Sequence, residues 1–221
     1  MSAILLIIGL FLLVMINVPI AVALGAVALI GMLVSKGFSS VYNAALTMFD
    51  AATSFPLLAI PLFILAGALM NTTSISRRLI NLTSALIGFV RGGLAMVNVG
   101  VSMFFAEISG SAVADVAAIG SVLIPAMKRR RYTPELSAAV TSSSASIAII
   151  IPPSIAMILY GALSDTSIVQ LFVAGIIPGV LGGFSMMGLC YWYAVRYDLP
   201  REEAFSLRKL WVAFKEAGWA L

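Results

Sequence analysis

Long apolar runs, most of them interrupted by a proline-containing or polar break, constrain this chain more than any other feature of its sequence. The runs cover residues 3–34, 49–70, 94–127, 134–163 and 168–195. Roughly 20 helical residues cross a bilayer core, so these runs are long enough to enter a membrane. Because 62% of the residues are hydrophobic and only 10% are charged, the composition lies far from that of soluble domains. The sequence predicts an all-α integral membrane protein, a bundle of several membrane-spanning helices.

The residues that carry most metal and acid–base chemistry are nearly absent. The sequence has no histidine and a single cysteine, Cys190, inside an apolar run. These counts exclude an internal disulfide and a Cys/His metal site within this sequence, and they remove the commonest general base. The net charge of +4 does not indicate a nucleic-acid partner, because the cations stand at the ends of apolar runs, where they set membrane topology. We expect no enzyme activity and no organic cofactor.

Residues 1–71 are expected to form the N-terminal membrane spans. The first run is too long for a single upright crossing, and Asn17 with Pro19 marks a bend, since proline removes a backbone hydrogen bond. Residues 35–47 are expected to connect this span to the next. Residues 72–92 then combine arginines with regularly spaced apolar residues, a pattern typical of an amphipathic helix lying in the membrane interface.

Residues 93–131 contain two apolar stretches of about 15 residues, separated by Ser109, Gly110 and Ser111. At a rise of 1.5 Å per residue, neither stretch alone crosses a core of about 30 Å. We therefore expect a re-entrant hairpin, which enters the membrane, turns near its middle and leaves on the side from which it came.

Residues 132–197 are expected to hold a helix broken at Ile151-Pro152-Pro153-Ser154, followed by a complete span over residues 168–195. Small residues within that span favour close helix contact. Residues 198–221 are predicted to be a cytoplasmic amphipathic segment that leads toward a further span. The residues expected to allow close contact are Gly175, Pro178, Gly179, Gly182 and Gly183.

The positions of the basic residues support this arrangement when the N-terminus is placed in the cytoplasm. Lys36 is then the only basic residue outside. All the others lie on the cytoplasmic side, in agreement with the positive-inside rule. The agreement depends on an interfacial segment at 79–90 and a re-entrant segment at 94–127. The basic residues placed inside are Arg77, Arg78, Arg91, Lys128, Arg129, Arg130, Arg131, Arg196, Arg201, Arg208, Lys209 and Lys215.

The two breaks are expected at similar membrane depth on neighbouring segments, where irregular backbone is tolerated only inside protein or beside a polar cavity. Half-helix C-termini there offer carbonyl oxygens to a cation. Serine hydroxyls add neutral oxygens, which suit a weakly bound, releasable sodium ion. The sodium candidates are Ser109, Gly110, Ser111 and Pro152, and the wider set of cation- or substrate-binding candidates adds Asp115, Ser143, Ser144, Ile151, Pro153 and Ser154.

Each of these features also has a purely structural explanation, and the sequence leaves both open. Ser111 is a suitable cap for the helix that follows it, and the serines before the second break are small enough to be packing residues between helices. Asp115 either favours the positive first turn of that helix or faces an aqueous cavity, since a buried membrane acid is costly.

With these residues in place, the chain resembles the large membrane subunit of tripartite ATP-independent periplasmic (TRAP) transporters, the DctM-like permeases. The similar segments are "SFPLLAIPLFILAGALMN", "GGLAMVNVGVSMFFAEISGSAVADVAAIGSVLIPAMKRRRY" and "IPPSIAMILYGALSDTSIVQLFVAGIIPG". Their order and spacing together are far more specific than any one tripeptide. In this resemblance, Ser109 to Ser111 match the first hairpin tip and Ile151 to Ser154 match the broken helix beside it.

The resemblance implies an elevator-type secondary transporter built from two inverted repeats. It implies sodium-driven uptake of organic acids such as dicarboxylates, sialic acid or related sugar acids across a bacterial or archaeal inner membrane. The implied partners are a small membrane subunit, an external substrate-binding protein, the lipid bilayer and the C-terminal half of the large subunit. That half is expected because members of the family are roughly twice as long as this chain.

Two departures from the family pattern accompany the resemblance. Ala148 and Ile149 stand where family members often have Gly-Pro, so the local backbone path before the double proline is open. The short length leaves an alternative function, a non-transporting scaffold or assembly subunit of a membrane complex. An intramembrane serine protease is not expected, because the sequence supplies no histidine to activate a serine.

Overall fold

The computed structural model describes residues 3–201 and 205–218, apart from the side chains of residues 3, 71, 72, 108 and 109. Over these residues the chain is helical, and the only β-type pairing is one isolated bridge between Arg91 and Arg201. The chain divides into two compact units, Met1–Phe55 and Pro56–Leu221. The all-α class predicted from the apolar runs is confirmed.

The first unit contains the helices α1 (Ala3–Met15), α2 (Ile20–Lys36) and α3 (Ser40–Thr53). Asn17, in the left-handed conformation at φ 69°, and Pro19 end the first helix where a bend was expected. The result is a reversal rather than a bend, because Leu6 of α1 lies against Gly31 of α2. The expected connection over residues 35–47 is wrong, since only a short turn after Lys36 separates α2 from α3.

The second unit begins with the 3₁₀ turn η1 (Phe55–Leu58, whose first residue belongs to the first unit) and α4 (Ala59–Thr72), followed by α5 (Ile75–Ile87). The segment predicted to be a re-entrant hairpin contains two helices, α6 (Gly93–Ser109) and α7 (Ala112–Arg129), and its re-entrant course stays a prediction. The predicted broken helix consists of α8 (Pro134–Ala145), the 3₁₀ turn η2 (Ser146–Ile149) and α9 (Ile155–Ser164). The last helices are α10 (Ile168–Arg196) and α11 (Leu207–Ala217).

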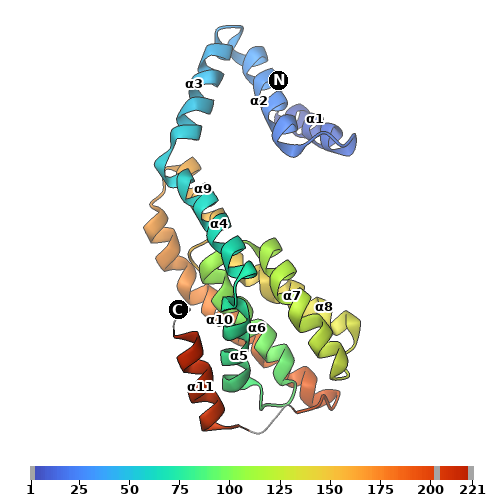
Figure 1. Cartoon of the computed structure of the whole chain (residues 1–221). Helices are drawn as coiled ribbons and strands as arrows, with labels where there is room; N and C mark the ends of the chain where they lie inside the picture. Colours follow the sequence, from blue (N-terminus) through green and yellow to red (C-terminus); the bar gives the residue numbers. More distant parts are fainter. Residues whose placement is uncertain (1–2, 202–204, 219–221) are drawn as a thin grey trace. The chain divides into compact units, whose positions relative to one another are not determined.

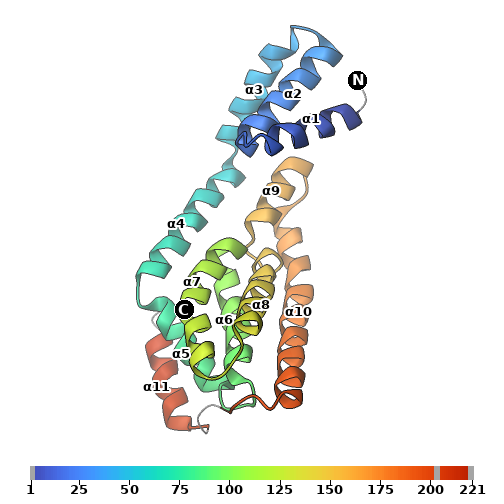
Figure 2. The ribbon, with the colours of Figure 1, turned by 90° about the vertical axis from the view of Figure 1, so that its right-hand side faces the viewer.

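Helix α6 is the centre of the second unit. Figures 1 and 2 show α7 and α8 along one side of it and α10 along another. Val97, Val99 and Val101 are completely buried although they point to different sides of the helix. A helix that is apolar on all sides is one that other helices surround, so the hairpin is anchored through α6.

Among the described helices, α10 alone is long and apolar enough to cross a membrane, and α3 with the η1–α4 segment meets the same criterion only as a bent pair. Only 17% of the apolar window of α10 is buried within the protein, and Ile177 and Leu181 are more than half exposed. Exposed aliphatic side chains of this kind suit a lipid environment, because lipid tails are as apolar as the side chains and no hydrophobic effect favours burying them inside the protein. The predicted span over residues 168–195 is therefore confirmed as a helix.

Candidate functional site

The tip of the α6–α7 hairpin is a tight turn that glycine makes possible. Gly110 ends α6 in the left-handed conformation, at φ 57° and ψ 13°, which a residue without a Cβ adopts at little cost. Its N–H donates to the Ala106 carbonyl at 3.3 Å. Ser111 then caps α7, because its hydroxyl accepts a hydrogen bond from the Ala114 N–H at 3.5 Å. The structural role considered for Ser111 is therefore present.

The double-proline break separates η2 from α9. The backbone N–H groups of Ile150 and Ile151 both donate to the Ile147 carbonyl at 2.9 Å, and the chain then leaves helical geometry through Pro152 and Pro153. Ser154 is fully buried, and its hydroxyl donates to the Ile149 carbonyl at 2.8 Å. This bond fastens the two sides of the break together. The Ser154 oxygen keeps acceptor capacity, since a hydroxyl that donates still has lone pairs.

The hairpin tip and the break lie against each other. A Cβ atom added to Gly110 would lie 2.9 Å from the Pro153 carbonyl oxygen and 3.2 Å from the Ile155 N–H nitrogen. Only glycine fits here, because both its positive φ and this close approach exclude a side chain. The prediction that the two breaks are neighbours is thus confirmed by the geometry, although the breaks are 40 residues apart in the chain.

Helix α10 packs against the same break through glycines spaced four residues apart. A Cβ at Gly175 would lie 2.6 Å from the Ile150 carbonyl oxygen, and one at Gly179 would lie 2.6 Å from Ile151 Cγ1. Gly183 continues the row and meets Met103 of α6, whereas Gly182 faces open space. The expected close contact is therefore confirmed for three of the four glycines, and the row holds Ile150 and Ile151 in place.

A buried network of polar side chains joins α6 to α8. The Asn98 amide donates to the Thr141 hydroxyl at 2.7 Å. Ser144 donates to the Asn98 carbonyl oxygen at 3.3 Å, and the Ser102 hydroxyl donates to Ser144 at 2.9 Å. All four side chains are at most 1% exposed. Satisfied buried networks of this kind hold two elements in a unique arrangement.

The network divides the serine run considered as a source of oxygens. Thr141 and Ser144, three residues apart, face α6, whereas Ser142 and Ser143 are exposed. Asn98 was missed by sequence reasoning, although an amide within the apolar run of residues 94–106 was a signal for such a contact. Whether Ser143 or Ser144 contacts a transported species stays a prediction.

The acidic candidate lies in the first turn of α7. Asp115 is 1% exposed. It lies in the first turn of the helix, where the helix dipole favours a negative charge. Glu107 is exposed on the last turn of α6. Ser109 ends α6 at the tip, and its side chain lies outside the described part of the structure.

Apart from the carboxylates of Glu107 and Asp115 on the two turns beside it, the tip offers neutral oxygens. Within the described residues, no group of three or more histidine, cysteine, aspartate or glutamate side chains is placed to hold a metal. The C-terminal turn of α6 directs its last carbonyls toward the tip, and the Pro153 carbonyl approaches from the break. Such oxygens suit a hard monovalent cation rather than a transition metal.

Comparisons with known proteins identify the family that this chain resembles. The family described as the DctM component of tripartite ATP-independent periplasmic transporters matches residues 7–221. The chain is 42% identical over 207 residues to the isethionate TRAP transporter permease protein DctMQ of Oleidesulfovibrio alaskensis, covering 93% of this chain and 32% of that protein.

Two further relatives carry different substrates in their names. The chain is 43% identical to the 2,3-diketo-L-gulonate TRAP transporter large permease protein YiaN of Escherichia coli, over 80% of this chain and 42% of that protein. It is 42% identical to the sialic acid TRAP transporter permease protein SiaT of Haemophilus influenzae, over 76% of this chain and 27% of that protein. The chain thus spans less than half the length of each of these three relatives.

Proposed function

Because the chain belongs to the DctM family of TRAP transporter large permeases, we propose that it forms part of a sodium-driven importer of an organic acid. The observation that carries this proposal is the contact between Gly110 and the Pro153 carbonyl. It brings two helix breaks together at one point, and broken helices are where membrane transporters bind coupling ions.

In the proposed mechanism, a sodium ion binds between the hairpin tip and the double-proline break. Backbone carbonyls at Ser109, Gly110 and Pro152, with the hydroxyl of Ser111, replace part of the hydration shell of the ion. Ile151, Pro153 and Ser154 hold the break in the conformation that offers these oxygens. Neutral ligands keep the affinity moderate, so that the ion is released when the site faces the cytoplasm.

The transported substrate is proposed to be an organic acid anion. Isethionate, 2,3-diketo-L-gulonate and sialic acid, which appear in the names of the relatives, all carry an acid group. A bound cation offsets the negative charge of such a substrate near the membrane centre, where an uncompensated charge is costly. Cotransport with sodium therefore supplies both driving force and charge compensation.

The proposed assembly lies in the inner membrane with the N-terminus of this chain in the cytoplasm. The α6–α7 pair is proposed to be re-entrant, since its helices of 17 and 18 residues are shorter than the roughly 20 residues of a full crossing. Partners are a small membrane subunit, an external binding protein that delivers the acid, and the segment that completes the large subunit. Two inverted repeats would then move as an elevator.

The test is uptake of a labelled organic acid by the complete transporter in proteoliposomes, with its binding protein outside. We expect uptake with an inward sodium gradient and little with an inward potassium gradient of the same size. Uptake that is equally fast in potassium would contradict the sodium-driven mechanism. A complex that binds its partners but never takes up an acid would instead favour a scaffold.

A further inference from the structure

The two amphipathic helices α5 and α11 pack against each other, although they are far apart in the sequence. Leu82 of α5 contacts Ala213 and Ala217 of α11 in one apolar cluster. At the edge of this pair, the rings of Phe89 and Phe205 meet edge to face with centroids 5.2 Å apart. The sequence predicted each helix separately but not this pairing.

A pocket of about 680 Å³ opens between α5 and α11, away from the hairpin tip. One part of its wall is apolar and includes Ala85, Phe89, Phe205 and Val212. Another part is polar and includes Asn81 and Ser84. The site is therefore built for a ligand that is itself partly apolar and partly polar.

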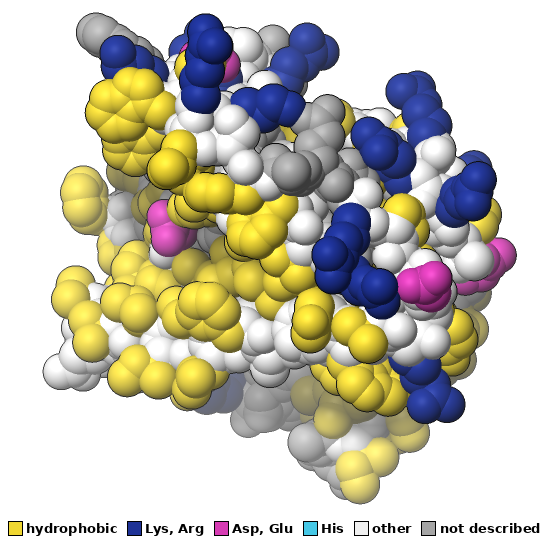
Figure 3. Space-filling model, turned by 90° about the horizontal axis from the view of Figure 1, so that it is seen from below, with side chains coloured by type: hydrophobic (Ala, Val, Ile, Leu, Met, Phe, Trp, Pro, Cys, Tyr) yellow, Lys and Arg dark blue, Asp and Glu magenta, His cyan; other side chains and the backbone are white. Residues whose placement is uncertain are grey.

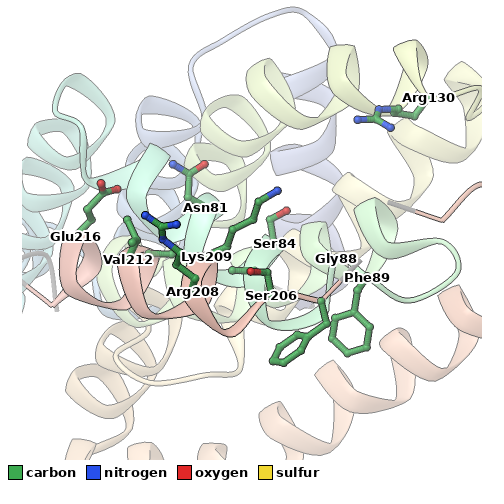
Figure 4. A pocket seen from close by; sticks show the side chains of 13 residues that line it. Asn81, Ser84, Gly88, Phe89, Arg130, Ser206, Arg208, Lys209, Val212 and Glu216 are labelled. Atoms are coloured by element: carbon green, nitrogen blue, oxygen red, sulfur yellow. The ribbon is translucent and has the colours of Figure 1, made fainter. Parts of the chain in front are cut away.

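Cations from two separate elements line the pocket. Arg208 and Lys209 lie at the start of α11, and Arg130 directly follows the last residue of α7. Figure 4 shows Arg208 and Lys209 on the side of Asn81 and Ser84, with Arg130 at the far end of the pocket. Glu216 is the one acidic residue among the lining residues that the structure describes, so the described lining has a positive excess.

The surroundings of the pocket are those of a membrane interface. Figure 3 shows lysine and arginine side chains gathered beside hydrophobic ones on this face of the second unit. Trp211 and Phe214 of α11 are 61% and 54% exposed, and their rings stack with centroids 6.4 Å apart. Exposed tryptophan near basic residues is typical of helices at the level of lipid headgroups.

We propose that this pocket binds an anionic phospholipid from the leaflet on the cation-rich side. Arg130, Arg208 and Lys209 receive the phosphate-containing headgroup, and the apolar wall receives the first part of an acyl chain. A free phosphate ion fills only a small part of such a volume, since a water molecule occupies about 30 Å³, and it leaves the apolar wall uncovered. Basic pockets between helices are typical sites of acidic lipids.

The position of Arg130 gives the lipid a structural consequence. Because Arg130 follows the last turn of α7, the headgroup links the base of the hairpin to the α5–α11 pair. The lipid therefore stabilises the hairpin at its base, far along α7 from the tip that is proposed to bind sodium. This inference does not depend on sodium coupling or on the identity of the transported acid.

The test is native mass spectrometry of the complete large subunit in detergent, titrated with phosphatidylglycerol or with phosphatidylcholine. We expect tighter binding of phosphatidylglycerol than of phosphatidylcholine. The double change Arg208→Gln and Lys209→Gln should weaken phosphatidylglycerol binding about twenty-five-fold, at about five-fold per cation. The matched control is Arg129→Gln with Lys215→Gln, which also removes two positive charges, one from α7 and one from α11, at positions outside the pocket lining.

Four results would overturn the proposal. Equal binding of the two lipids would exclude headgroup recognition, and equal weakening in the control variant would indicate general surface charge. Displacement of phosphatidylglycerol by millimolar inorganic phosphate would indicate a free-anion site. If crosslinkers attached at positions 84 and 209 capture the small membrane subunit, and the pocket retains no lipid, the surface is a protein interface.

Discussion

Replacing Gly179 by alanine tests whether the glycine row of α10 positions the break. The new Cβ atom would lie 2.6 Å from Ile151 Cγ1 and 3.3 Å from the Ile151 nitrogen, whereas ordinary contacts begin at 3.4 Å. Either α10 or Ile151 must therefore move until this distance reaches the 3.4 Å of an ordinary contact. Gly182→Ala is the matched control, because nothing lies within 4 Å of its Cβ position.

The two substitutions are expected to change stability in opposite directions. Overpacking costs about 1–3 kcal/mol, while alanine in a helix interior gains about 0.5–1 kcal/mol over glycine. Gly179→Ala should thus destabilise the protein by roughly 0.5–2 kcal/mol, and Gly182→Ala should be neutral or slightly stabilising. Because the displaced residue is Ile151, sodium affinity should also fall in the first variant.

The assay is the thermal unfolding midpoint of the complete large subunit, measured over a sodium titration. A destabilisation of 1 kcal/mol corresponds to a shift of about 2–4 °C for a domain of about 150–250 residues, and to a smaller shift for the longer complete subunit. The reasoning would be refuted if Gly179→Ala matched Gly182→Ala in both its midpoint and its response to sodium. That result would mean that α10 does not hold the break.

Three further substitutions test the tip, the polar network and the buried acid. Gly110→Ala should lose the sodium response and about 1 kcal/mol or more of stability, because its conformation is left-handed and the Pro153 carbonyl is close. The control Gly37→Ala, at φ 74° in open space, should lose only stability. Denaturation curves with and without sodium distinguish the two variants. Ser144→Ala should cost about 1–3 kcal/mol by leaving buried partners unsatisfied, against almost nothing for exposed Ser143→Ala; equal unfolding midpoints would contradict the network. Asp115→Asn should slow uptake more than it lowers expression if the carboxylate serves the transport cavity, and a loss of expression alone would assign it a structural role.

Local features of the sequence predicted the elements of the site well. The Ser109-Gly110-Ser111 and Pro152-Pro153 breaks ended helices where expected, because glycine and proline act on the backbone of their own residues. The span over residues 168–195 matched α10 (Ile168–Arg196). The breaks were also predicted to lie on neighbouring segments, which the close approach of Gly110 to Pro153 confirms, whereas their membrane depth stays a prediction.

Long-range contacts were harder to predict. The pairing of α5 with α11 joins helices more than 100 residues apart, and amphipathicity identifies a buried face without identifying the partner that covers it. The reversal after Met15 depends on Asn17 adopting a left-handed conformation, which is uncommon for a residue other than glycine. Asn98 of α6 is the partner of Thr141 and Ser144. The sequence of residues 141–144 alone does not show where Asn98 lies, so it could not show which hydroxyls face α6.

The most direct test of the cation site is the effect of sodium on the unfolding temperature of the complete large subunit, with potassium at the same ionic strength as control. Sodium at a hundredfold excess over its Kd should stabilise the folded protein by about 2.7 kcal/mol, and the effect should be absent in Gly110→Ala. A response that is equal in sodium and potassium, or that persists in Gly110→Ala, would contradict a sodium site between the hairpin tip and the double-proline break.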